Sequence, residues 1–264
     1  MLIKKTINYI SKLILIVYIL FVYNIEESNA QGFPWQYSAR LPVDIPKFYY
    51  GINVNYGYII SKGALSFLED NINCLSFKNG TGSSLSFGIN GEYWNQTNSF
   101  AYTFALNYII NNLNYKFTDF VPISKDITAE YENRLDLDYS NIAANVGIKY
   151  RLLNTHFHLG AGLSIATSLL SNFNVKERII GPETMPPFQT NPPSYERDII
   201  NGQFDDFSII EFYPNISFGY DLNFGNGKYL TPVVSMYIPI MDVMKHDNVR
   251  NLVFTAGIKA NFNF

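Results

Sequence analysis

The sequence predicts an all-β fold, an eight-stranded antiparallel up-and-down barrel that spans a membrane with its strands. Eight stretches alternate apolar and polar residues with the period of two that a β-strand requires. The connections between these stretches are alternately long and short. Aromatic residues make up 16% of the chain and charged residues only 16%. This combination is typical of transmembrane barrels, which have short turns at one end and long loops at the other.

Residues 1–30 are predicted to be a cleaved secretory signal. Three lysines accompany the apolar run 13–23, and Ser28-Asn29-Ala30 offers small residues for cleavage before Gln31. The apolar run is too short to span a bilayer comfortably, although an uncleaved N-terminal anchor is the alternative. Residues 31–47 contain three prolines, so we expect an extended periplasmic lead-in without a helix.

The predicted barrel occupies residues 48–264. In each strand one face collects aromatic and aliphatic residues, and the other collects Gly, Ser, Asn and Ala. Small side chains fit the crowded interior of an eight-stranded barrel, so we expect the apolar rows to face lipid. A soluble β-sandwich also alternates, but it has no reason to place its long loops at one end. The strands are predicted at 48–59, 83–95, 99–110, 134–151, 156–169, 207–222, 229–240 and 251–264.

The three longest connections, 60–82, 111–133 and 170–206, are expected to be polar outer loops. Loops on a rigid scaffold commonly carry binding function, so a surface role would lie there. The apolar phase changes between Tyr139 and Ile142. We interpret this change as a β-bulge near Ser140-Asn141, or as a strand that leaves the membrane at that point.

The last predicted strand alternates along its whole length and ends at Phe264. A strand of this kind resembles the closing strand of bacterial outer-membrane barrels. The resemblance implies the outer membrane of a Gram-negative cell as the location. It also implies that the barrel-assembly machinery is a partner that binds the chain through Phe264.

Two hairpins extend this resemblance to a particular family. The segments S-N-I-A-A-N-V-G-I-K-Y-R-L at 140–152 and H-F-H-L-G-A-G-L-S-I-A at 156–166 resemble the central hairpin of the PorT-like outer-membrane β-barrel family. Residues 229–243 and 257–264 look like its last hairpin, although Pro239 replaces a more usual turn residue and a proline frequent in the fourth strand is absent. The family implies an OmpA/OmpX-like architecture. One member assists a protein-secretion system, so an accessory role in secretion is an implied function.

Charged and histidine side chains fall on the predicted inner face. We interpret the charges as an ion-pair network that fills the lumen and prevents conduction, because buried charges are tolerated when paired. A proton or ion path is the alternative. His156 and His158 lack a third ligand at suitable spacing, so we expect lumen hydrogen bonding rather than metal binding. The charged residues are Glu92, Lys149, Arg151, Glu211, Asp221 and Lys259.

No catalytic, cofactor-binding or metal site is assigned, and no enzyme activity is predicted. Asp136 and Asp138 share a face near the outer rim, where they are either solvated or bind a divalent cation. A lipase barrel would present a Ser/His/acid set to lipid, but Ser164 is predicted to point inward. A net charge of −3 provides no basic field for nucleic acid. Cys74 is the only cysteine, so no intrachain disulfide forms.

We therefore expect a small outer-membrane barrel with a filled lumen and a structural or surface-binding role through its outer loops. A secretion accessory and, less favoured, a narrow channel are the alternatives, since eight strands leave little bore.

Overall fold

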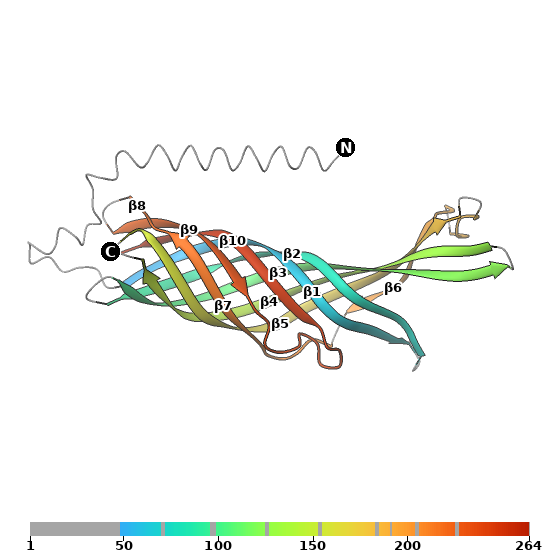
Figure 1. Ribbon diagram of the computed structural model, residues 1–264, viewed down its shortest axis with the longest axis horizontal. Helices are drawn as coiled ribbons and strands as arrows, with labels where there is room; N and C mark the ends of the chain where they lie inside the picture. The colour runs from blue at the N-terminus through green and yellow to red at the C-terminus, as the bar shows by residue number, and fades with distance from the viewer. Residues whose placement is uncertain are drawn as a thin grey trace, which may run out of the picture.

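The computed structural model describes an all-β molecule (Figure 1). The described residues are 48–69, 72–95, 99–124, 127–152, 155–182, 185–190, 192–203, 206–224 and 227–263. The predicted signal, the lead-in and Phe264 lie outside this part of the chain. Among the described residues, no helix is long and apolar enough to cross a membrane.

The described residues form ten β-strands, which make one antiparallel sheet. Their bounds are β1 Phe48–Glu69, β2 Ile72–Trp94, β3 Phe100–Ser124, β4 Ile127–Arg151, β5 Phe157–Gly181, β6 Glu196–Gln203, β7 Glu211–Tyr220, β8 Leu222–Asn223, β9 Lys228–Tyr237 and β10 Arg250–Phe262.

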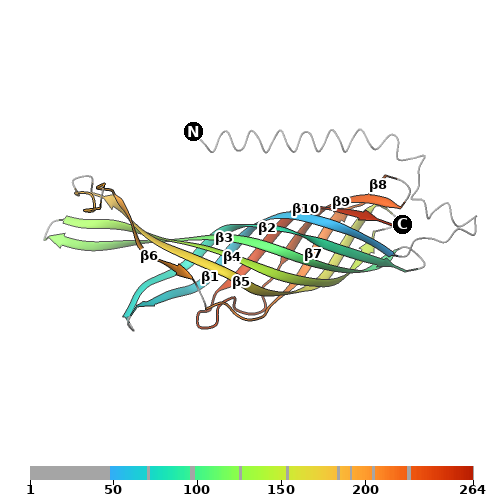
Figure 2. The same ribbon diagram turned by 180° about the vertical axis from the view of Figure 1, so that it is seen from behind.

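The sheet closes on itself through eight of these strands. The pairing order runs β10-β1-β2-β3-β4-β5-β7-β9, and β9 pairs in turn with β10. Strand β8 prolongs the line of β7 against β9, while β6 pairs only with β5 outside the ring. Figure 2 shows the same closed wall from behind. The prediction of an eight-stranded antiparallel up-and-down barrel is confirmed.

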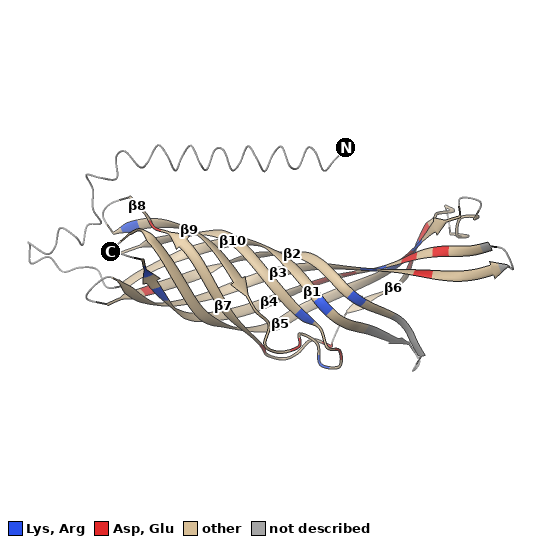
Figure 3. Ribbon diagram, in the orientation of Figure 1, with Lys and Arg blue, Asp and Glu red and all other residues tan. Residues whose placement is uncertain are grey.

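Large apolar side chains cover the outside of the barrel. On β1, Tyr50, Ile52, Val54, Tyr56 and Tyr58 are 38–64% exposed, and the residues between them point inward. The same alternation runs round the wall, and Figure 3 shows that it carries little charge between its two ends. The predicted outward direction of the apolar rows is therefore correct. We call this surface the apolar belt; it includes Ile52, Val54, Phe87, Ile89, Phe104, Leu106, Val146, Ile148, Leu159, Ile216, Phe218, Val234 and Ile258.

The predicted long loops are mostly strand, so this part of the sequence interpretation was wrong. β1 and β2 continue pairing to Glu69 and Ile72, and β3 and β4 continue to Ser124 and Ile127. Strand β5 runs to Gly181. Past the belt polar and apolar residues are mixed on the outer face, so the alternation of hydropathy fades while backbone pairing continues. The outer ends of β3, β4 and β5, together with β6, form a projecting sheet (Figures 1 and 2).

The predicted bulge is present, but it lies on the neighbouring strand. The register between β4 and β5 shifts at Ser140/Asn141, where Ser140 pairs with Leu170 and Asn141 with Ser168. The additional residue is therefore Leu169 of β5. Strand β4 keeps its phase, so the apolar residues before Ser140 point into the lumen.

Two further strand limits differ from the prediction. β7 begins at Glu211 rather than at 207, because Phe207 packs inside the barrel mouth. β9 ends at Tyr237 rather than at 240, although Ile238 N and Ile240 N still donate to Pro214 O and Phe212 O of β7.

Candidate functional site: a closed lumen and a projecting sheet

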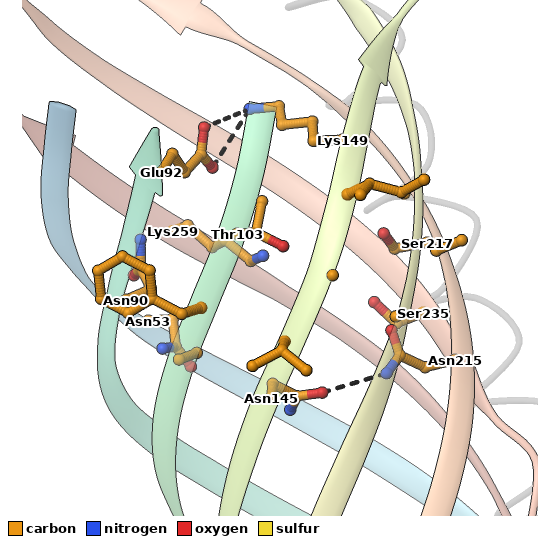
Figure 4. Close-up of a pocket in the computed structure, with 18 of the residues that line it drawn as sticks. Asn53, Asn90, Glu92, Thr103, Asn145, Lys149, Asn215, Ser217, Ser235 and Lys259 are labelled. Atoms are coloured by element: carbon orange, nitrogen blue, oxygen red, sulfur yellow. Dashed lines mark hydrogen bonds and ion pairs between the residues drawn. The ribbon is translucent and has the colours of Figure 1, made fainter. Parts of the chain in front are cut away.

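Four of the predicted inward charges meet near the N-terminal end of β1. Lys149 Nζ lies 3.0 Å from Glu92 Oε2 and 2.9 Å from Asp221 Oδ1, and Arg151 Nη2 lies 3.3 Å from Asp221 Oδ2. All four are at least 94% buried. They come from β2, β4 and the junction of β7 with β8. We call them the ionic cluster; its contact between Lys149 and Glu92 is drawn in Figure 4.

Aromatic and hydroxyl groups surround the ionic cluster. The Tyr229 hydroxyl donates to Glu92 Oε2 at 2.5 Å, and Thr231 Oγ1 donates to Asp221 Oδ1 at 2.8 Å. The Arg151 guanidinium lies 4.2 Å from the centre of the Trp94 ring, and Lys149 Nζ lies 5.1 Å from it. Both carboxylates therefore contact a cation and a neutral donor, which is the condition for tolerating buried charge.

Two of the six predicted charges lie apart from this cluster. Lys259 lines a cavity together with Glu92 and Lys149. Glu211 accepts hydrogen bonds from the Tyr213 hydroxyl at 2.7 Å and Ser168 Oγ at 3.2 Å. The network interpretation is thus correct for four residues, while Glu211 forms a separate neutral-donor site further along the lumen.

The middle of the lumen is packed with amide and hydroxyl side chains. Asn145 accepts a hydrogen bond of 3.1 Å from Asn215 Nδ2 (Figure 4). Two cavities of about 60 Å³ each adjoin here, and Asn107, Asn145 and Tyr237 line both. Each has room for roughly four water molecules. Such cavities do not amount to an open bore.

A cluster of apolar side chains fills the lumen beyond the belt, which we did not predict. We call it the apolar plug. Its phenols have hydroxyl and amide partners, since Tyr115 shares a 2.6 Å hydrogen bond with Ser61 and Asn251 Nδ2 donates to the Tyr139 hydroxyl at 3.0 Å. The sequence did contain a signal for the plug, the apolar row Leu135, Leu137 and Tyr139. We interpreted the change of apolar phase between Tyr139 and Ile142 as a bulge, and therefore did not predict that this row points inward. The buried members are Ile59, Leu65, Phe77, Leu113, Tyr115, Leu135, Leu137, Tyr139, Val175, Phe207, Val243, Met244 and Val249.

Two segments near the mouth, 206–210 and 238–250, supply the plug with Phe207, Val243, Met244 and Val249. We call them the strap. Ser208 N donates to Val243 O at 2.8 Å, and Lys245 N donates to Asp206 O at 2.9 Å. The Phe207 and Tyr139 rings lie 4.7 Å apart between centroids. The strap therefore closes the outer end of the lumen.

The two predicted inward histidines lie near the ionic cluster, and Ser164 lies further along the lumen. His158 Nδ1 lies 3.5 Å from Asp221 Oδ1 beside the ionic cluster, and the His156 ring packs 5.6 Å from that of Tyr220. Within the described part of the chain, no three His, Cys, Asp or Glu side chains are grouped for a metal ion. Ser164 points inward as predicted, but it is six positions from His158 along β5, a span of roughly 20 Å. They cannot act together.

Asp136 and Asp138 lie on the outer face of β4, beyond the belt. Asp136 contacts Asn114 and also Arg134, whose Nε lies 2.9 Å from Oδ1, and Asp138 contacts Asn112. These partners occupy the carboxylates as a cross-strand polar ladder.

Comparisons with known proteins give structural neighbours but no sequence relative. No family model matches the chain, and no curated protein sequence matches it. Neisserial surface protein A, NspA, is 13% identical with a TM-score of 0.36, covering 82% of this chain and 98% of NspA. Ail, the attachment invasion locus protein of Yersinia pestis, solved with the heparin analogue sucrose octasulfate, is 13% identical with a TM-score of 0.32, covering 82% and 100%.

The outer membrane protease OmpT from Escherichia coli is 8% identical with a TM-score of 0.29, covering 82% of this chain and 96% of OmpT. Because these overlaps are weak, the fold assignment rests on the strand pairing and exposure of this chain itself.

Proposed function

We propose that this chain is an outer-membrane β-barrel with a closed lumen, which acts at the cell surface through its projecting sheet. The observation that carries the proposal is the apolar belt around a closed barrel. In water this surface would drive association, whereas acyl chains solvate it without cost. Closure also pairs every wall strand on both sides, which a medium without water requires.

The closed lumen argues against transport. The ionic cluster blocks one end, the apolar plug and its strap block the other, and the two cavities that lie between them measure about 60 Å³ each. The barrel is therefore a rigid support. The parts that extend beyond it, β3 to β6, are where a binding function has room.

Two other functions remain alternatives. A secretion accessory is supported only by the resemblance of the two hairpins to the PorT-like family. Crosslinking in intact membranes followed by identification of the captured proteins tests it, and recovery of no secretion component would argue against it. A narrow channel would give discrete steps in planar-bilayer recordings, where we expect a silent baseline.

The main experiment asks where the protein goes and whether it forms a barrel. The chain, expressed in a Gram-negative host, should fractionate with the outer membrane and change its mobility on SDS gels after boiling, because closed barrels resist SDS until heated. Protease added to intact cells should cleave within the projecting sheet and leave the wall protected. A soluble periplasmic product with unchanged mobility would contradict the proposal.

A further inference from the structure

The projecting sheet has a free strand edge. β3 pairs with β2 only as far as Tyr115, which is opposite Gly80. β3 pairs with β4 on its other side as far as Ser124. Residues 116–124 therefore have a strand on one side, while their opposite backbone edge has no strand among the described residues. A free edge of this kind is a template for another strand.

Exposed apolar side chains line this edge on both faces. Phe117, Val121 and Ile123 are 39%, 41% and 51% exposed, and Phe120, on the opposite face, is 63% exposed. Phe188, in the connection between β5 and β6, packs against Tyr131 of β4 with ring centroids 6.4 Å apart. Four of the nine residues of the β3 edge are therefore exposed and apolar, and a further strand would cover part of their surface.

The other edge of the same sheet is protected. It is formed by β6, whose first three residues, Glu196, Arg197 and Asp198, are all charged. Charge on an edge strand is one of the usual devices that prevent strand addition. On β3 the corresponding protection is limited to Lys116, Asp119 and Pro122, which lacks an amide donor. The two edges therefore differ in their readiness to accept a strand.

We propose that residues 116–124 of β3 bind an extended segment of another protein by strand addition, with apolar side chains at alternate positions of that segment. Backbone hydrogen bonds would supply affinity, and the exposed side chains beside the edge would select the sequence. This inference rests on the proposed function, because the edge must stand outside the membrane to meet a partner.

The partner is not a second copy of this chain in the same membrane. Copies side by side share one orientation, so β3 runs from barrel to tip in both (Figure 1). A two-fold axis along the barrel would then set amide against amide and carbonyl against carbonyl at each level. A foreign segment is free of this constraint.

The test uses the full chain in lipid nanodiscs and a fluorescent synthetic nonapeptide with valine at alternate positions and threonine or lysine between them. We expect saturable binding by fluorescence anisotropy. A peptide N-methylated on one alternate set of amides keeps one donating edge and should still bind, whereas methylation of every amide should abolish binding. The double variant Phe120→Lys/Val121→Lys should bind the unmethylated peptide at least tenfold more weakly.

The control is Ile180→Lys, because Ile180 is 48% exposed on the same sheet but lies on β5, which β4 separates from the free edge of β3. The affinity of the Ile180→Lys variant for the unmethylated peptide should stay within twofold of that of the parent protein. Equal binding of the fully methylated peptide, or no saturable binding, would overturn the inference. Heat-modifiable mobility of each preparation is scored separately, so loss of binding by an intact barrel contradicts strand addition alone, and loss of the mobility change contradicts the proposed function.

Discussion

Lys149 Nζ and Asp221 Oδ1 lie 2.9 Å apart, although 72 residues separate them in the chain. The contact joins β4 to the end of β7 across the lumen, and Glu92 of β2 contacts the same ammonium group. Three distant parts of the wall are thereby held at one level. The cluster both occupies the lumen and selects the register in which its charges are paired.

Removing this cation should destabilise the barrel strongly. Lys149→Met removes the cation that contacts both buried carboxylates, Glu92 and Asp221, and breaking a buried pair from one side costs about 3 kcal/mol or more. Urea unfolding in lipid vesicles, followed by tryptophan fluorescence, measures the loss. Lys116→Met is the matched control, since its 3.5 Å contact with Glu132 is largely exposed and should change stability by less than about 1 kcal/mol.

A charge in the middle of the belt should also be costly. Val54 lies midway along the exposed row of β1. Val54→Arg should lower the free energy of unfolding in vesicles by roughly 2–4 kcal/mol, because the guanidinium faces acyl chains. The same substitution at Ile180, on the projecting sheet, should have little effect. Equal tolerance at both positions would mean that the belt does not lie in a bilayer.

The strap should open more often when the buried Phe207 side chain is truncated. Phe207 is 93% buried and packs against Tyr139. Phe207→Ala removes contacts worth about 3 kcal/mol, enough to raise the open population roughly a hundredfold. Trypsin should then cleave at Lys245 much faster in the folded protein. Ile209→Ala, at a position 75% exposed in the same segment, should leave the cleavage rate unchanged.

Gly63 allows the strap to approach β1. Its φ is +135°, and a Cβ placed there would lie 1.8 Å from the Asn248 carbonyl oxygen. Gly63→Ala should therefore cost about 1–3 kcal/mol in backbone strain alone, with the steric clash in addition. Hydrogen exchange of the outer half of β1 should become faster. Gly181→Ala provides the comparison, because a Cβ at that position would lie 3.9 Å from its nearest neighbour, Glu130 Oε2. In this variant the hydrogen-exchange protection of β1 should be unchanged.

The wall of the barrel was predictable because its signal is local. Alternation along β1, β2 and β10 specifies which face of each strand is apolar, and the structure exposes those faces. The limits of the strands were less predictable, because past the belt both faces of a hairpin tolerate polar residues. Phe207 illustrates the same difficulty, since an apolar residue beside a strand is equally compatible with the wall and with the plug.

The sequence by itself determined that the chain is a sheet with one apolar and one small polar face, since a period of two depends only on neighbouring residues. The tertiary structure decided what fills the lumen. Whether Lys149 meets Asp221, or Tyr139 meets Phe207, depends on strand register and closure across the whole barrel. The tertiary structure also decided that β3 continues beyond its pairing with β2, which leaves the free edge. How far two strands pair depends on both of them, so the sequence of one strand does not predict it.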